Sequence, residues 1–189
     1  VAGKLNLEGR SGDASRSAAA RLETGTDRFA LHADAFNRRS GDVAVPIALA
    51  CEKPGAPTIA NAICNSSAQT QGGALGGSVF FGHSRLGASV SSYSSNYGTV
   101  AEDAVTIGMR STRAALEWDV DQLTGWFQNV KVRASQTDYQ HTEYEGEEAG
   151  TVFNNKGNDL RISARHAKLG AWEGVLGLQS EAVSFSADG

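Results

Sequence analysis

The segment from Gly125 to Gly150 has the clearest alternation of apolar and polar positions in the chain. Its even-numbered positions are mostly apolar from Trp126 to Ala134, whereas its odd-numbered positions are polar or charged from Asn129 to Glu143. Successive side chains of a strand point to opposite faces, so the segment is predicted to be a strand with one apolar and one wet face. It is longer than most strands, and its apolar positions do not follow a helical period.

The same period of two recurs on both sides of this segment. Val105, Ile107 and Met109 have the opposite phase to Thr112–Trp118, which predicts a bulge near Arg110 or a change of environment along the strand. About nine strands and no helix are expected. Besides the segment above, the expected strands are 3–10, 15–23, 27–36, 75–84, 86–93, 104–120, 151–167 and 172–185.

The connections between these strands are expected to alternate in length, and all three tryptophans lie beside short ones. Transmembrane β-barrels have short turns at one end, long loops at the other and aromatic side chains at the membrane interfaces. The sequence therefore predicts an all-β, antiparallel, up-and-down transmembrane β-barrel. A soluble antiparallel sandwich with one solvated face is the alternative. The short connections are 24–27, 84–86, 119–125 and 168–170, the long ones are 38–76, 95–104 and 143–152, and the tryptophans are Trp118, Trp126 and Trp172.

In a barrel of this kind the apolar face meets lipid and the charged face lines a wet lumen. The stretch from Trp126 to Ala134 would cover on the order of 20–25 Å of membrane height at a tilt of ~45°. The side chains expected to face lipid are Leu116, Val130, Val132, Leu160, Ile162, Leu176 and Leu178.

Composition and motifs exclude several classes of function. The 189 residues carry a net charge of −4 without a basic stripe, so no nucleic-acid partner is expected. No stretch has the roughly 18–20 apolar residues of a transmembrane helix. The glycine-rich run Gly72–Ser78 lacks the Lys-Ser/Thr of a phosphate loop, and Gly82–Gly87 has Leu86 where a nucleophile elbow needs glycine. No enzyme activity is expected.

Cys51 and Cys64 are the only cysteines, and they lie 13 positions apart in the irregular region 38–76. This spacing does not fit a CxxC zinc or redox pair. A disulfide formed in an oxidising compartment is expected, with two free thiols as the alternative. A loop of this size would stabilise the folded state by on the order of 3 kcal/mol.

His141 is the histidine with a candidate role. It shares the polar face of its strand with Glu143 and lies close in sequence to Asp138. Imidazole and carboxylate groups together are suitable ligands for zinc or a similar divalent cation, although one strand cannot complete a tetrahedral site. A solvated acidic loop is the alternative. His32 is expected to be a wet lumen residue.

Several segments together resemble the barrel of bacterial TonB-dependent outer-membrane receptors, with the zinc-uptake branch nearest. The segments are FALHADAFNR, NSSAQTQGGALGGSVFF, SNYGTVAEDAVTIGMRSTRAALE and TDYQHTEYEGEEAGTVFNNKGNDLRISARH, followed by LGLQS. This resemblance implies a 22-stranded barrel in the outer membrane, closed by an N-terminal plug and driven by the TonB–ExbB–ExbD system. It implies energised uptake of a scarce extracellular nutrient, zinc or a metal chelate, with no required cofactor. The zinc branch takes ligands from plug and barrel, which would correspond to His141, Glu143 and Asp138 here.

The chain departs from that family in extent. A 22-stranded barrel at roughly 25–30 residues per strand and loop needs several hundred residues, and neither a plug nor a TonB box is visible. Residues 1–189 are therefore expected to be one partial barrel domain with the plug absent and 38–76 as its long outer loop. A small outer-membrane barrel or an adhesin that binds a partner through 38–76 is the rival hypothesis.

Overall fold

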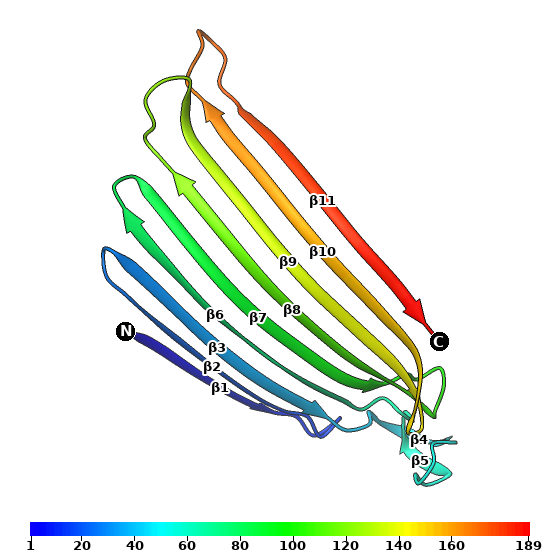
Figure 1. Cartoon of the computed structure of the whole chain (residues 1–189). Helices are drawn as coiled ribbons and strands as arrows, with labels where there is room; N and C mark the ends of the chain where they lie inside the picture. Colours follow the sequence, from blue (N-terminus) through cyan, green and yellow to red (C-terminus); the bar gives the residue numbers. More distant parts are fainter.

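Nine strands follow one another up and down in a single antiparallel sheet (Figure 1). The computed structural model describes residues 1–189, and it contains no helix that could cross a membrane. The predicted all-β class and nine-stranded meander are confirmed, and the sheet is open, with β1 and β11 at its edges. The strands are β1 (Ala2–Gly9), β2 (Arg16–Gly25), β3 (Phe29–Ser40), β6 (Ala68–Phe81), β7 (Ser84–Gly98), β8 (Val105–Val120), β9 (Phe127–Glu145), β10 (Glu148–His166) and β11 (Val175–Asp188); β4 (Ala44–Ala50) and β5 (Ile59–Ala62) form a separate two-stranded sheet.

The register of the central strands is continuous. β8 pairs with β7 and with β9 over its whole length without a shift, so the predicted bulge near Arg110 is wrong. The alternative, a change of environment along the strand, agrees with the structure. Met109 and Glu117 lie on the same face of β8, but Met109 faces His141 near one end of the sheet and Glu117 faces Arg133 near the other.

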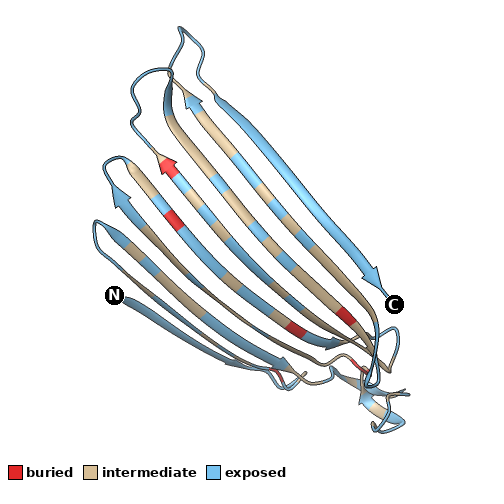
Figure 2. Cartoon of the chain, viewed as in Figure 1, coloured by how far each residue is buried: buried red, intermediate tan, exposed pale blue.

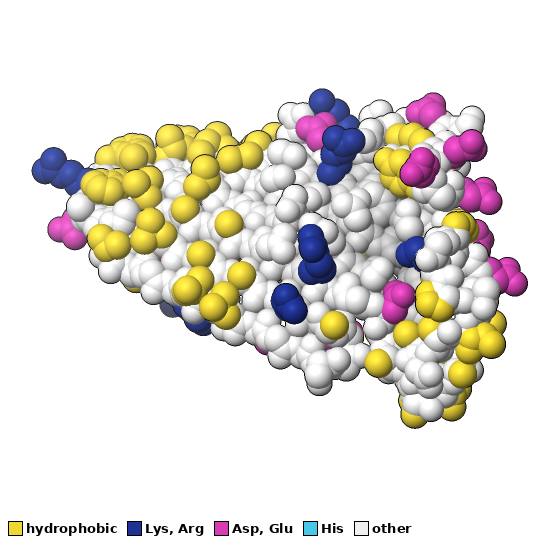
Figure 3. All heavy atoms as spheres, turned by 90° about the horizontal axis from the view of Figure 1, so that it is seen from below, with side chains coloured by type: hydrophobic (Ala, Val, Ile, Leu, Met, Phe, Trp, Pro, Cys, Tyr) yellow, Lys and Arg dark blue, Asp and Glu magenta, His cyan; other side chains and the backbone are white.

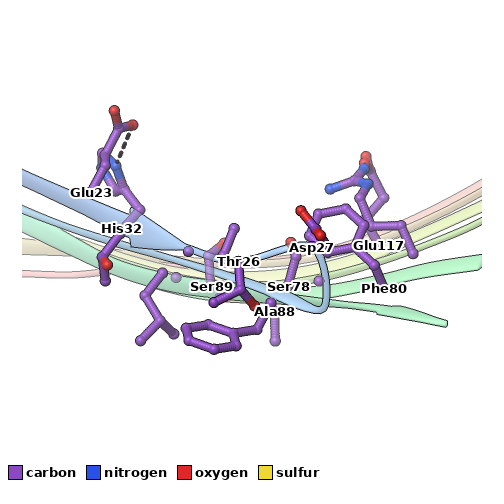
Figure 4. A pocket seen from close by; sticks show the side chains of 18 of the residues that line it. Glu23, Thr26, Asp27, His32, Ser78, Phe80, Ala88, Ser89 and Glu117 are labelled. Carbon is purple, nitrogen blue, oxygen red and sulfur yellow. Dashed lines mark hydrogen bonds and ion pairs between the residues drawn. The ribbon is translucent and has the colours of Figure 1, made fainter. Parts of the chain in front are cut away.

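The two faces of the sheet differ in chemistry. Glu23, His32 and Glu117 lie on its concave side, as Figure 4 shows. The opposite, convex face carries an unbroken apolar row across seven neighbouring strands. In order across the sheet, this row consists of Phe29, Val79, Leu86, Trp118, Val132, Ile162 and Leu178.

A single layer leaves almost nothing buried. Only 8 of the 189 residues are buried, and they are scattered along the sheet and its loops (Figure 2). A sheet normally covers its apolar face with a second layer, which this one lacks. Hydrophobic side chains gather over one half of the molecule, and acidic ones concentrate at the end that carries β4 and β5 (Figure 3). We call the half away from β4 and β5 the inner half, and the other the outer half.

The connections differ from those expected. At the inner end, the β6–β7 turn is Gly82-His83 rather than 84–86, and Gly82 has φ +55, as the first residue of such a two-residue hairpin loop requires. At the outer end, much of the expected loop sequence is strand, since β7 extends to Gly98 and only Gly146-Glu147 separates β9 from β10. The insertion 41–67 between β3 and β6 is therefore the one long connection.

Two features fix this insertion. Cys51 and Cys64 form the expected disulfide, with Cα atoms 5.4 Å apart. Asn65 is fully buried, and its side-chain nitrogen lies 3.1, 3.0 and 2.5 Å from the carbonyl oxygens of Thr99, Glu102 and Val105. The insertion is thus joined to the β7–β8 connection.

Candidate functional site on the concave face

The inner half of the concave face carries a network of ion pairs across β7, β8 and β9. Asp119 lies 2.6 Å from Arg85 Nη2 and 3.0 Å from Lys131 Nζ. Glu117 bridges Arg85 and Arg133 in the same way. Each carboxylate thus contacts two cations, and the Asp119 side chain is only 11% exposed. These paired acids form a fixed charged surface, which differs from a free general base or metal ligand.

His32 lies on the same concave face, as expected, and both of its ring nitrogens are occupied. Nε2 lies 2.7 Å from Asp34 Oδ2, and Nδ1 lies 3.2 Å from Glu23 Oε1. Glu23 also accepts a hydrogen bond of 2.6 Å from Arg21. An imidazole donates from both nitrogens only when it is protonated, so the two carboxylates suit an imidazolium. Neither ring nitrogen is free to bind a metal.

An open groove of about 960 Å³ reaches from the Glu23–His32 pair to Glu117 (Figure 4). Small residues line the part between them, including Gly76 and Ser89. The backbone is therefore approachable there, and charged groups lie on both sides.

The outer half of the concave face is aromatic. One row across the sheet carries an aromatic side chain on every second strand from β3, with small or amide side chains between them. The Phe36 and Tyr93 ring centroids are 6.3 Å apart across Gly72, where a Cβ would overlap the Phe36 ring. This aromatic row consists of Phe36, Gly72, Tyr93, Ser111, Tyr139, Asn155 and Phe185.

His141 belongs to this aromatic surface. Its ring stacks on Phe153 with centroids 4.4 Å apart, and its Nδ1 lies 3.1 Å from the Tyr139 hydroxyl. Glu143 is on the same face, but Asp138 is on the convex face, 3.4 Å from Lys156. The structure therefore does not bring the three expected metal ligands together, and zinc ligation by His141 and Glu143 stays a prediction.

The one compact group of potential metal ligands is Cys51, Cys64 and Asp103. The two sulfurs are joined as a disulfide and offer no thiolate. This group is therefore no evidence for a metal.

The expected lipid-facing residues share one surface, whereas the three expected interface tryptophans do not. All seven expected lipid-facing side chains lie on the convex face. Trp118 belongs to the apolar row there, and Trp126 and Trp172, each 79% exposed, lie in connections at the inner end. Sequence reasoning missed the aromatic row and the ion-pair network, because cross-strand neighbours follow from register, which a single strand does not reveal.

No protein-family model matches the chain.

Proposed function

We propose that the nine-stranded sheet is part of the wall of a transmembrane β-barrel in a bacterial outer membrane. The protein is then a receptor that captures a scarce extracellular nutrient for energised uptake. The supporting observation is the convex apolar row of Phe29, Val79, Leu86, Trp118, Val132, Ile162 and Leu178, which no second layer covers.

Water is an unfavourable neighbour for this surface. Leu31 on the same face is 52% exposed and Leu178 66%, so each forgoes roughly half of the about 1.5–3 kcal/mol that complete burial of a leucine would provide. Exposed apolar patches of this extent are typical of an interaction surface. In hydrocarbon the same side chains are solvated, and the sheet needs no second layer.

The concave face and the edges fit the same proposal. Ion pairs and an imidazole on one face suit a water-filled lumen. The edge strands β1 and β11 are exposed along their whole length. Because lipid does not tolerate unpaired strand edges, further strands would have to pair with them to close the barrel.

The uptake mechanism and substrate rest on the resemblance to TonB-dependent receptors. Outer loops and lumen would capture zinc or a metal chelate selectively, and the TonB–ExbB–ExbD system would then move a plug. No bond is made or broken in this mechanism. Of the expected ligands, the sheet offers His141 and Glu143 on the concave face.

The test is the depth and facing of single spin labels in the full-length protein reconstituted in lipid. Labels at Val132 and Leu178 should be accessible to oxygen and protected from a water-soluble nickel complex. Labels at the neighbouring concave positions Arg133 and Gln179 should show the reverse. Nickel access at Val132 and Leu178 equal to that at the concave positions would overturn the proposal.

A surface-binding protein or adhesin is the second candidate. The observation that favours it is the disulfide-closed insertion 41–67, which Asn65 joins to the β7–β8 connection. Replacing the insertion by a short glycine linker separates the two functions. Loss of attachment to a surface by a protein that shows no uptake would indicate an adhesin, and loss of uptake would indicate a receptor loop.

A further inference from the structure

The convex face changes character towards the outer half of the sheet. In this outer half, beyond the apolar row, the convex face carries four basic side chains and two acidic ones, Asp138 and Asp188. The whole chain has a net charge of −4, so this surface is enriched in positive charge against the general composition. The basic residues are Arg16 on β2, Arg39 on β3, Arg110 on β8 and Lys156 on β10.

Two of these arginines directly oppose each other. Arg16 pairs with Arg39 across β2 and β3. Arg39 donates to the side-chain oxygen of Gln69 at 3.0 Å, and neither arginine forms an ion pair. Like charges opposite each other across a sheet are unfavourable, and an anion between them would relieve the repulsion.

The other two basic residues line a polar groove of about 430 Å³ across β8 to β11. Arg110 makes no hydrogen bond or ion pair through its side chain, whereas Lys156 lies 3.4 Å from Asp138. The Gln140 side-chain amide donates a hydrogen bond of 2.8 Å to Asn154 Oδ1. Ser184 and Ser186 line the groove on the β11 side. Guanidinium, ammonium, amide and hydroxyl groups together suit a phosphate on a hydroxyl-rich sugar.

The position of these basic side chains along the strands, beyond the apolar row, matches the level of lipid headgroups. Along β8, going from the apolar row towards the outer end, the convex residues are Leu116, Ala114, Thr112 and Arg110. Along β10 they read Leu160, Asn158 and Lys156. In the proposed barrel the insertion 41–67 is an outer loop, so the outer half of the sheet faces the outside. The apolar row then lies among the acyl chains, and the basic side chains lie at the headgroups of the outer leaflet. Basic residues at this level attract anionic lipid.

We propose that this convex basic surface binds the phosphorylated sugar headgroup of an anionic outer-leaflet lipid. Arg110 and Lys156 hold one phosphate in the β8–β11 groove, with Gln140 and Asn154 on the sugar hydroxyls, and Arg16 and Arg39 hold a second. The inference rests on the proposed membrane orientation and adds the class of lipid that the outer surface selects.

The test uses the full-length protein in phosphatidylcholine nanodiscs, titrated with lipid A and, separately, with dephosphorylated lipid A and inorganic phosphate. The double variant R110Q/K156Q should lose about tenfold or more in affinity for lipid A, and R16Q/R39Q should lose affinity as well. The matched control R113Q removes a charge from the concave face of the same strand and should leave the affinity unchanged.

Equal affinity for phosphorylated and dephosphorylated lipid A would overturn the inference, as would equal losses in R113Q and R110Q/K156Q. Effective competition by inorganic phosphate would also overturn it, because it would indicate a free-anion site. A protein that does not enter nanodiscs at all refutes the proposed function itself. A protein that enters them without preferring lipid A refutes this inference alone.

Discussion

The side chain of Asn65 occupies the space that a Cβ on Gly98 would need. Gly98 is the last residue of β7, and the buried Asn65 amide lies against it and within hydrogen-bond distance of the carbonyls that follow. Asn65 itself has φ +55, a left-handed conformation that asparagine tolerates better than most residues. This pair joins the insertion 41–67 to the sheet.

Gly98→Ala should therefore detach the insertion. The added methyl group displaces the Asn65 amide from its carbonyl partners, and an unsatisfied buried polar group costs about 1–3 kcal/mol. Limited proteolysis should show faster cleavage within 41–67. Gly157→Ala is the matched control, since a Cβ there meets no atom within 4 Å and the residue lies in a strand. Equal protease resistance of the two variants would contradict the role of Gly98.

Replacing both cysteines should loosen the insertion without unfolding the sheet. Cys51 and Cys64 close a loop with a sequence separation of 13, and removing such a link typically costs about 3 kcal/mol through the greater entropy of the open loop. In the double alanine variant, hydrogen exchange should rise in β4 and β5 and stay unchanged in β7 to β9. A parallel rise in the central strands would show that the insertion supports the whole sheet.

A charge on the convex face should cost far more than the same charge on the concave face. Val132→Lys places an ammonium in the apolar row between Trp118 and Ile162. In the proposed membrane barrel this substitution should cost about 2–4 kcal/mol near the bilayer midplane. Ser135→Lys, on the concave face opposite Asp159, should be close to neutral. Unfolding in lipid vesicles by denaturant measures both. Equal effects would mean that Val132 does not face hydrocarbon.

The turn between β1 and β2 should weaken in acid. A hydrogen bond from the Ser15 side chain, with a further one of 3.1 Å from its backbone N–H, holds the pKa of the Asp13 carboxyl below its ordinary value of 3.8. Because the folded pKa is lowered, the stabilisation is fully present above pH 3.8 and is lost as the pH falls through the lowered value. A carboxyl titration by NMR should give a lowered pKa for Asp13, and Ser15→Ala should raise this pKa part of the way towards 3.8, because the backbone hydrogen bond remains. An ordinary pKa in the unsubstituted protein would contradict the hydrogen bonding.

Zinc binding by the proposed receptor should depend on one face of β9. His141→Ala with Glu143→Ala should weaken calorimetric zinc binding to the full-length protein by on the order of tenfold or more, because both side chains lie on the concave face. Asp138→Asn is the control, since this carboxylate lies on the convex face beside Lys156. Unchanged affinity in the double variant would remove His141 and Glu143 from the ligand set.

How much could be predicted from the sequence depended on height along the strands. In the inner half, the alternation correctly placed Leu160, Ile162 and Ala164 on one face. This worked because the convex face of the sheet is apolar there and the concave face is charged. In the outer half both faces are largely polar, so residues 95–98 and 143–152 lost the alternation and were expected to be loops. The expected bulge near Arg110 has the same origin, because the apolar residues of the outer half, such as Met109, lie on the concave face.

The candidate site was less predictable than the fold. His141 was found by its neighbours in sequence, but its actual partner Phe153 lies on β10 and is set by register. Asp138 was grouped with His141 by proximity along the chain, although positions an odd number apart in a strand face opposite ways.

The length of β9 and β10 sets how far the proposed barrel wall would extend beyond the membrane. Each strand has 19 residues, which at ~3.3 Å per residue and ~45° tilt corresponds to a height of about 45 Å, against an apolar band of about 25 Å. In the proposed orientation the part of each strand beyond the apolar band extends above the lipid as a continuous hydrogen-bonded sheet. A diffusing solute would then meet a stiff rim of fixed height, and large particles would be held off the bilayer by the protein's own backbone.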